Sequence, residues 1–245
     1  MSKSTLAPPT SGSLRPAEKK DKYDPAKSTT SKAEPGRFFV KYGNNSTVQG
    51  AIYTDTVSVA GIQVTDQYLA AASVLSPLFT TEPGNGLVQR LLQNIYSFIP
   101  PRILGMAFPA ISNLNHTPFF QNAIHQNKVA PGIFALYLAE SGSELHLGGT
   151  NPRHYSGPIE YHPVIDTEAN GTSKLAFWLL DKAEVGVNGK SVPLSPFKTI
   201  IDSGTTFMYS SLDEVEKFYA RVPGSQALSG DLEGSYSFPC DEVPR

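Results

Sequence analysis

The chain has 245 residues, enough for one large domain or two small ones, and its 20 basic and 22 acidic residues leave a net charge of −2. No basic patch indicates a nucleic-acid partner, and no apolar run is long enough to span a membrane. Glycine and proline each occur 20 times among frequent Thr, Ser, Tyr and Phe, which predicts an all-β protein with many turns. The single cysteine, Cys240, leaves the redox compartment open.

Residues 1–22 differ in composition from the rest of the chain. They are rich in Ser, Thr, Pro and Lys and contain two large aliphatic residues, Leu6 and Leu14. Such a segment buries too little apolar surface to fold, so we expect it to be disordered. It also lacks the continuous apolar stretch of a secretory signal peptide.

Several elements follow in chain order. Residues 38–43 and 48–57 indicate two strands of a hairpin, with the turn-forming residues 44–46 at its tip. Thr117 is predicted to cap a short helix over residues 119–126, with a proline in its first turn. Residues 133–138 and 143–149 indicate a second hairpin, and an Asn-Gly pair at 188–189 predicts a third.

A lone acid, Asp202, follows an apolar strand ending in the β-branched run 199–201. Glycine and hydroxyl residues come directly after it, so the strand enters a tight turn. Backbone amides and hydroxyls of the turn can hold the carboxylate in one orientation. The candidate donors are Gly204, Ser203, Thr205 and Thr206. Such a carboxylate could act as a catalytic acid or base, or could simply form an Asx-turn that ends a strand.

An amphipathic helix is predicted after this turn. Ser211 and Glu214 have the spacing of a capping box, and apolar residues recur on one helical face before Pro223-Gly224 ends the pattern. Those apolar residues are Leu212, Val215, Phe218, Tyr219 and Val222. The predicted unit is an apolar strand, an acid turn and a helix.

Residues 200–207 resemble the active-site signature of the pepsin-like (family A1) aspartic peptidases, and the resemblance extends from about Tyr23 to Cys240. It implies an all-β, bilobal pepsin-like fold, here incomplete at both ends, as in a truncated fungal-type member. Residues 23–150 would form a partial N-terminal lobe with the flap hairpin. Residues 151–245 would form a partial C-terminal lobe that carries the Asp-Ser-Gly motif.

The resemblance also assigns roles. Asp202 matches a catalytic aspartate of an endopeptidase, and Tyr42 matches the tyrosine of the flap. The implied substrate-binding residues are Tyr42, Gly43, Ser203, Gly204, Thr205 and Thr206. The implied substrate is a polypeptide and no cofactor is needed. The five histidines show no zinc-binding spacing, so no metal is expected.

Two features depart from the family pattern. Residues 87–102 contain a helix-like apolar spacing where the family runs directly into its Ile-Leu-Gly strand, and we interpret them as an insertion. The chain also contains one Asp-Ser/Thr-Gly turn, that of Asp202, whereas the family uses two. Hydrolysis by carboxylates requires a pair that shares a proton, so we expect the chain alone to be inactive.

Alternatives remain open. The chain could be a non-catalytic peptide-binding module, or a homodimer in which two copies of Asp202 meet; the sequence leaves the oligomeric state undecided. The family is usually secreted or vacuolar, whereas residues 1–22 do not predict a signal peptide, so localisation is open as well. Asn44, Asn45, Asn115 and Asn170 begin N-glycosylation sequons, which matter only in a secreted form.

Overall fold

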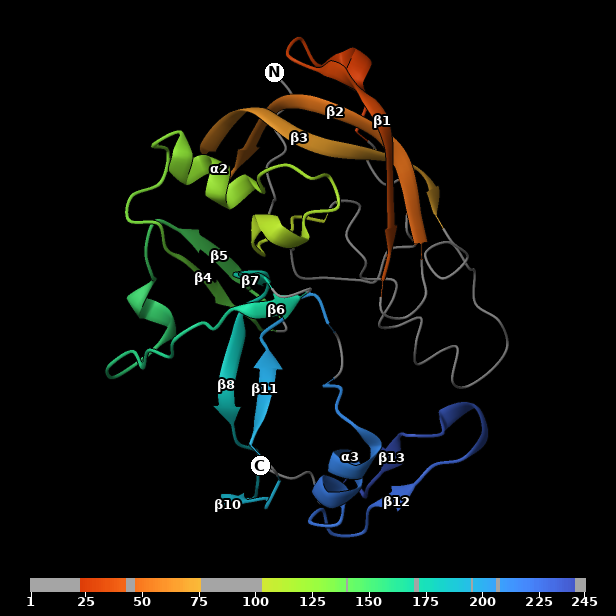
Figure 1. Ribbon diagram of the computed structural model, residues 1–245. Helices are drawn as coiled ribbons and strands as arrows, with labels where there is room; N and C mark the ends of the chain where they lie inside the picture. The colour runs from red at the N-terminus through yellow and green to blue at the C-terminus, as the bar shows by residue number, and fades with distance from the viewer. Residues whose placement is uncertain are drawn as a thin grey trace. The chain divides into compact units, whose positions relative to one another are not determined.

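The computed structural model describes residues 23–42, 47–75, 103–139, 141–169, 172–194, 196–205 and 208–240 (Figure 1). In this part of the chain, strands predominate and the two α-helices are short, which confirms the predicted all-β class. The chain divides into two compact units, Met1–Ile159 and Glu160–Arg245. The lobe boundary predicted between residues 150 and 151 stays a prediction. Residues 1–22, predicted to be disordered, and residues 87–102, interpreted as an insertion, lie outside the described part of the chain.

The first unit is built on a three-stranded antiparallel sheet of order β1-β2-β3. Its strands are β1 (Lys32–Lys41), β2 (Thr47–Val59) and β3 (Ile62–Leu75). Lys41 pairs with Thr47, which confirms the hairpin predicted there; the tip at residues 43–46 lies outside the described part.

A tight turn joins β2 to β3. Val59 pairs with Ile62, and the two residues between them, Ala60 and Gly61, have φ values of 50° and 82°. Positive φ at both central residues is typical of a type I′ turn. The backbone twist of this turn matches the right-handed twist of the two strands that it joins. The strands also approach closely at Gly50, where an added Cβ would lie 2.1 Å from the carbonyl oxygen of Ala71.

The helix α2 (Phe119–His125) packs against β3 and closes the core of this unit. The buried core residues are Val59, Val64, Phe119, Phe120, Ala123 and Val129. The prediction that Thr117 caps α2 is wrong. Pro118 occupies the capping position in an extended conformation, and no side chain caps the helix. A capping side chain must come from the residue next to the first helical residue, and Thr117 is one position too early.

In the described residues, the rest of the first unit is a small hairpin and short 3-10 turns at separate places along the chain. β4 (Phe134–Tyr137) pairs antiparallel with β5 (Glu144–Leu147), as predicted. The 3-10 turns are η1 (Pro25–Lys27), η3 (Pro109–Ile111) and η4 (Pro152–His154).

In its described residues, the second unit consists of two-stranded antiparallel pairs and one α-helix. The pairs are β6 (Thr167–Ala169) with β7 (Thr172–Lys174), β8 (Leu179–Ala183) with β11 (Phe197–Ile200), β9 (Gly186–Val187) with β10 (Lys190–Ser191), and β12 (Gln226–Ala227) with β13 (Tyr236–Ser237). A 3-10 turn, η5 (Gly230–Leu232), lies between β12 and β13. Between β9 and β10, Asn188 and Gly189 both have positive φ, which confirms the predicted Asn-Gly turn.

The helix α3 (Leu212–Tyr219) begins as predicted, because the Ser211 hydroxyl accepts the Glu214 N–H at 3.4 Å. It ends at Tyr219, before the predicted stop at Pro223. Phe218 and Tyr219 pack on a core of Val187, Val192 and Val222. Leu212, predicted on the same face, is 74% exposed.

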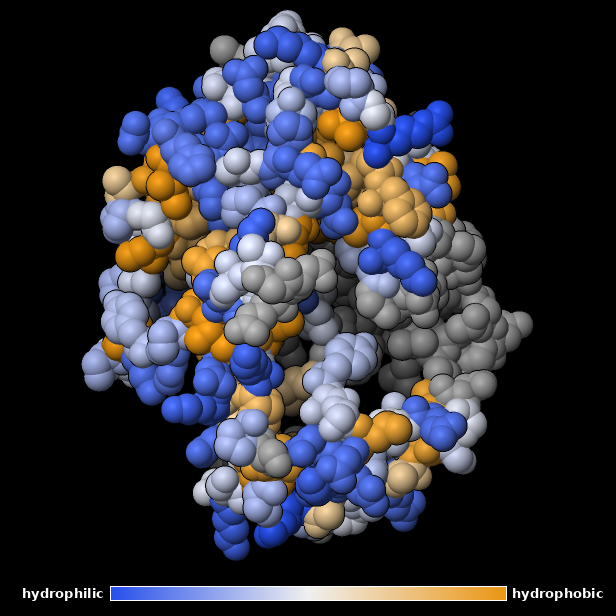
Figure 2. All heavy atoms as spheres, viewed as in Figure 1, coloured by the Kyte–Doolittle hydropathy of each residue, from blue (hydrophilic) through white to orange (hydrophobic). Residues whose placement is uncertain are grey.

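Large apolar side chains are exposed in both units, and orange spheres mark apolar residues on the visible face in Figure 2. Examples are Phe39 and Val74 in the first unit, and Met208 and Tyr209 in the second.

Candidate active site

Asp202 lies in a turn at the end of β11. Its Oδ1 accepts the backbone N–H of Gly204 at 2.8 Å, and its Oδ2 accepts the hydroxyl of Thr205. These two donors are among those predicted. The Ser203 hydroxyl makes no hydrogen bond to Asp202 among the described residues, and Thr206 lies outside them. The turn therefore fixes the direction of both carboxylate oxygens with donors from within three residues.

The strand before the turn positions Asp202 at the surface. β11 pairs with β8, and beyond the last strand residue the Ile201 N–H still donates to the carbonyl of Trp178 at 2.9 Å. Asp202 itself is exposed, as are Ser203, Gly204 and Thr205. The carboxylate is thus oriented by its own turn and accessible to a ligand.

The remaining predicted residues lie in the first unit. Tyr42 follows the last residue of β1 and is half-buried, and burial raises the pKa of its hydroxyl. Gly43 lies outside the described residues. The structure therefore brings Asp202, Ser203, Gly204 and Thr205 together in one turn and places Tyr42 in the other compact unit.

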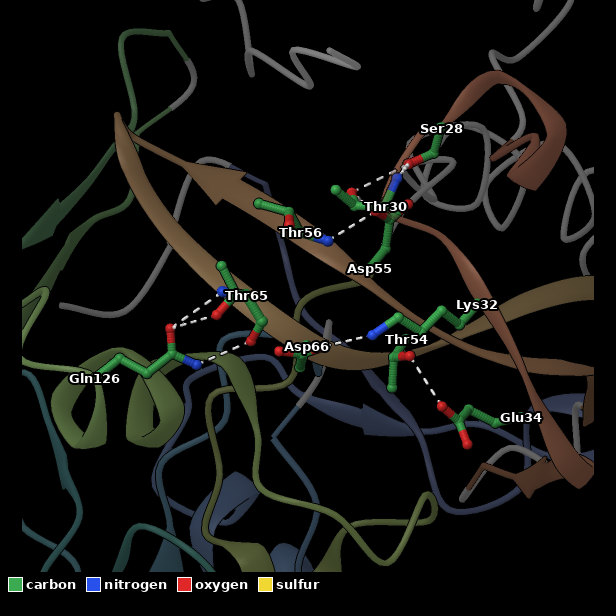
Figure 3. A network of polar contacts seen from close by, with 10 residues as sticks. All are labelled: Ser28, Thr30, Lys32, Glu34, Thr54, Asp55, Thr56, Thr65, Asp66 and Gln126. Carbon is green, nitrogen blue, oxygen red and sulfur yellow. Dashed lines mark hydrogen bonds and ion pairs between the residues drawn. The ribbon is translucent and has the colours of Figure 1, made fainter.

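A second carboxylate, Asp55 in β2, is 5% exposed and accepts four hydrogen bonds, and Figure 3 draws those from Ser28, Thr30 and Thr56. The donors are the hydroxyls of Tyr23 (2.9 Å), Ser28 (2.8 Å) and Thr30 (2.5 Å) and the backbone N–H of Thr56 (2.7 Å). Three of these donors come from the segment before β1. Asp55 therefore attaches that segment to the central strand of the sheet.

The electrostatics of this network follow from burial and hydrogen bonding. Burial alone would raise the pKa of Asp55, but the hydrogen bonds from Thr30, Ser28 and Tyr23 outweigh it and hold the pKa below its ordinary value. Burial raises the pKa of Tyr23 to about 12, and the neighbouring carboxylate contributes to the increase. Asp55 is therefore charged, and both of its oxygens accept hydrogen bonds.

This network was not predicted, because Asp55 is followed by Thr56-Val57 and has none of the turn-forming residues that mark Asp202 in the sequence. One signal was available: Tyr23 to Ser31 contains five hydroxyl side chains within nine residues, more than a short loop needs. Hydroxyl-rich segments require acceptors when they pack, and a carboxylate in a buried strand position requires donors.

A third polar cluster surrounds Glu144 in β5, beside a cavity of about 150 Å³. The Asn151 side-chain amide donates to both carboxylate oxygens at 3.0 Å, and imidazole nitrogens of His154 and His146 lie 3.2 and 3.3 Å from them. The bonds from Asn151 and His154 hold the pKa of Glu144 below its ordinary value. The ring of His154 also stacks on Tyr137 with 3.9 Å between centroids. This cluster attaches η4 to the β4–β5 hairpin.

No helix in the part of the chain that the structure describes is long and apolar enough to cross a membrane. Within the same residues, the histidine, cysteine and carboxylate side chains form no group of three that could hold a metal ion.

Comparison with known proteins shows the family of the chain. The family model described as eukaryotic aspartyl protease matches residues 10–245. An aspartic protease of Phaffia rhodozyma is 34% identical over 220 residues, which cover 88% of this chain and 48% of that protein. Cathepsin D of Gallus gallus is 31% identical over 91% of this chain and 50% of its own length. Pepsin A of Bos taurus is 28% identical, with coverages of 91% and 55%.

The chain thus spans about half the length of the curated relatives it matches. The match nevertheless includes nearly all of the chain, with the Asp202 turn and the β1–β2 hairpin inside it. The predominance of strands agrees with the pepsin-like fold of such proteins. The chain belongs to the eukaryotic aspartyl protease family.

Proposed function

We propose that this chain supplies one half of the catalytic site of an aspartic endopeptidase, with Asp202 as the catalytic carboxylate. The proposed substrate-binding residues are Ser203, Gly204, Thr205 and Thr206, which follow it in the sequence, and Tyr42 and Gly43, which match the flap that covers bound polypeptide in the family. The observation that carries the proposal is the Asp202 turn: an exposed carboxylate is oriented by a backbone N–H and a hydroxyl at the end of a strand.

The geometry suits acid–base work on a water molecule. The donors from Gly204 and Thr205 each occupy one carboxylate oxygen, but every carboxylate oxygen has two lone pairs, so acceptor capacity remains on both. Because the group is exposed, a water and a peptide carbonyl can reach it. A carboxylate in this position can accept a proton from the attacking water.

We further propose that the 245-residue chain by itself does not hydrolyse peptides. Two carboxylates close together hold one shared proton, so that one acts as base while the other donates to the carbonyl oxygen. The 245 residues contain a single Asp-Ser/Thr-Gly turn. A lone carboxylate can be the base or the acid at a given moment, and the reaction needs both.

The test is cleavage of an unfolded, fluorescently labelled protein at acid pH, with and without a transition-state-mimicking inhibitor of pepsin-like enzymes. We expect no inhibitor-sensitive cleavage by the purified monomer. Cleavage that the inhibitor blocks and that Asp202→Asn abolishes would refute the proposed inactivity. The matched control is Asp181→Asn, which changes an exposed aspartate in β8 of the same unit.

Binding separates the proposed function from its alternative. If Asp202 belongs to a peptidase site, the isolated chain should bind the inhibitor more weakly after Asp202→Asn, because the inhibitor hydroxyl loses its charged acceptor. Saturable binding of peptides that is unaffected by Asp202→Asn would instead favour a non-catalytic peptide-binding module. Isothermal titration of both variants measures the difference.

A further inference from the structure

The loop that leads into α2 displays an asparagine at the surface. Asn115 is exposed, its N–H donates to the carbonyl of Ser112 at 2.9 Å, and its φ of 54° lies in the left-handed region. Asparagine tolerates this conformation better than most residues do. The turn therefore gives a structural reason for asparagine at position 115.

The two following residues are attached to the fold of the first unit. The ring of His116 stacks on Tyr68 with 3.3 Å between centroids and an interplanar angle of 7°. The carbonyl of Thr117 accepts the side-chain amide of Gln67 at 3.2 Å, and Gln67 is 5% exposed. These contacts hold the backbone on the C-terminal side of Asn115, while its own side chain is left at the surface.

The hydroxyl of Thr117 does not cap α2, because Pro118 occupies the capping position and no side chain caps the helix. A left-handed turn explains Asn115 but does not explain a hydroxyl two residues later. Asn115, His116 and Thr117 together form an Asn-X-Thr acceptor triplet for N-linked sugar.

We propose that Asn115 is an N-glycosylation site, which takes its glycan from an oligosaccharide linked to a polyprenyl diphosphate. The side-chain nitrogen of Asn115 forms a bond to C1 of the first sugar. The bond from C1 to the diphosphate oxygen breaks, the electron pair leaves with the polyprenyl diphosphate, and the amide nitrogen loses one proton. The proposal is independent of the proposed peptidase function.

The site tolerates such an addition without unfolding. A glycan is bulky and hydrated, so its attachment point must be solvent-facing. Asn115 meets this requirement, and the backbone bonds that shape its turn do not use its side chain. The other three acceptor triplets begin at residues outside the described part of the chain and play no role in the argument.

The experiment uses the purified, folded full chain with a single-subunit oligosaccharyltransferase and its lipid-linked oligosaccharide, followed by mass spectrometry of the peptide that contains Asn115. We expect the glycopeptide from the wild type and from Thr117→Ser, and its complete loss in Thr117→Ala and Asn115→Asp. Aspartate also tolerates the left-handed conformation, so Asn115→Asp keeps the turn. The matched control is Asn113→Gln, an exposed asparagine two residues earlier that does not begin a triplet.

A synthetic peptide of residues 110–120 and a standard acceptor peptide complete the design, and circular dichroism verifies the fold of each variant. If the standard and the 110–120 peptides are modified but the folded chain is not, the site is inaccessible and the proposal is refuted. If only the standard is modified, the triplet followed by Pro118 is not an acceptor, and the proposal is refuted as well. Modification of the chain that survives Thr117→Ala would also overturn it.

Discussion

Replacing Asp55 by asparagine would test whether the hydroxyl-rich segment before β1 is held by charge. Asparagine keeps the shape and one acceptor oxygen. At present Oδ1 accepts Ser28, Thr30 and the Thr56 N–H, and Oδ2 accepts Tyr23. After the substitution three bonds go to a neutral acceptor, and the amide nitrogen faces the Tyr23 hydroxyl, which would then have to turn toward Ser31, 2.7 Å away.

The expected loss in the free energy of unfolding can be estimated from these hydrogen bonds. A hydrogen bond to a charged group contributes about 1.5–3 kcal/mol and a neutral one about 0.5–1.5, so each weakened bond costs on the order of 1 kcal/mol. Part of this loss is offset because a neutral amide is easier to bury than a carboxylate. We expect Asp55→Asn to lower the free energy of unfolding by about 2–3 kcal/mol.

The pH dependence gives a sharper test. Asp55 has a lowered pKa in the folded protein, so its charge stabilises the fold above the unfolded pKa of about 4. This contribution decreases as pH falls toward the folded-state pKa. Asparagine does not titrate, so the difference between wild type and Asp55→Asn should be full near neutral pH and should shrink below about pH 4.

The assay is urea unfolding followed by circular dichroism at several pH values, with hydrogen exchange of the β1 and β2 amides as a local readout. The matched control is Asp66→Asn, because Asp66 is an exposed aspartate of the same sheet with one ion pair to Lys32 at 3.3 Å. Its loss should stay within about 0.5 kcal/mol. An equal loss in both variants, or a loss from Asp55→Asn that does not change with pH, would refute the reasoning.

Two further substitutions test the packing of the first unit. Phe120→Ala should cost about 3–5 kcal/mol in urea unfolding, because Phe120 is 3% exposed in the core, while Phe39→Ala, at a side chain that is 54% exposed, should cost about 1 kcal/mol or less. Equal losses of stability in Phe120→Ala and Phe39→Ala would contradict the assignment of Phe120 to the core. Gly50→Ala should cost at least about 3 kcal/mol, because its Cβ would meet the Ala71 carbonyl oxygen at 2.1 Å, whereas Gly105→Ala has open space and should change stability by about 1 kcal/mol or less. A stable Gly50→Ala protein would contradict the close approach of β2 and β3.

The sequence predicted the Asp202 turn in detail because the interactions there are local. Gly204 and Thr205 are two and three residues from the acid, and both donate to it as expected. The side-chain donors of Asp55 are not local, because Thr30, Ser28 and Tyr23 lie 25, 27 and 32 residues away along the chain. Pairing over such distances is set by strand register, which a local pattern does not contain.

The same distinction applies to the fold. The Asn-Gly turn at residues 188–189 was predicted from its two residues alone, since both favour positive φ. The turn at Ala60 and Gly61 was not, because alanine rarely adopts that conformation. β3 was also missed: Ala70, Ala71 and Ala72 favour helix, and their pairing with β2 overrides that preference.

The short reach of the donors around Asp202 also matters for protein engineering. When all hydrogen-bond donors to a side chain come from its own loop, the side chain keeps its orientation if that loop is transferred to another protein. We therefore expect that residues 199–205 can be grafted onto the end of an unrelated antiparallel strand. The Asp202 carboxylate should keep the same orientation there, because Gly204 and Thr205 move with it. Such a graft would be a compact building block for designed acid–base sites, with the second group left to the designer's choice.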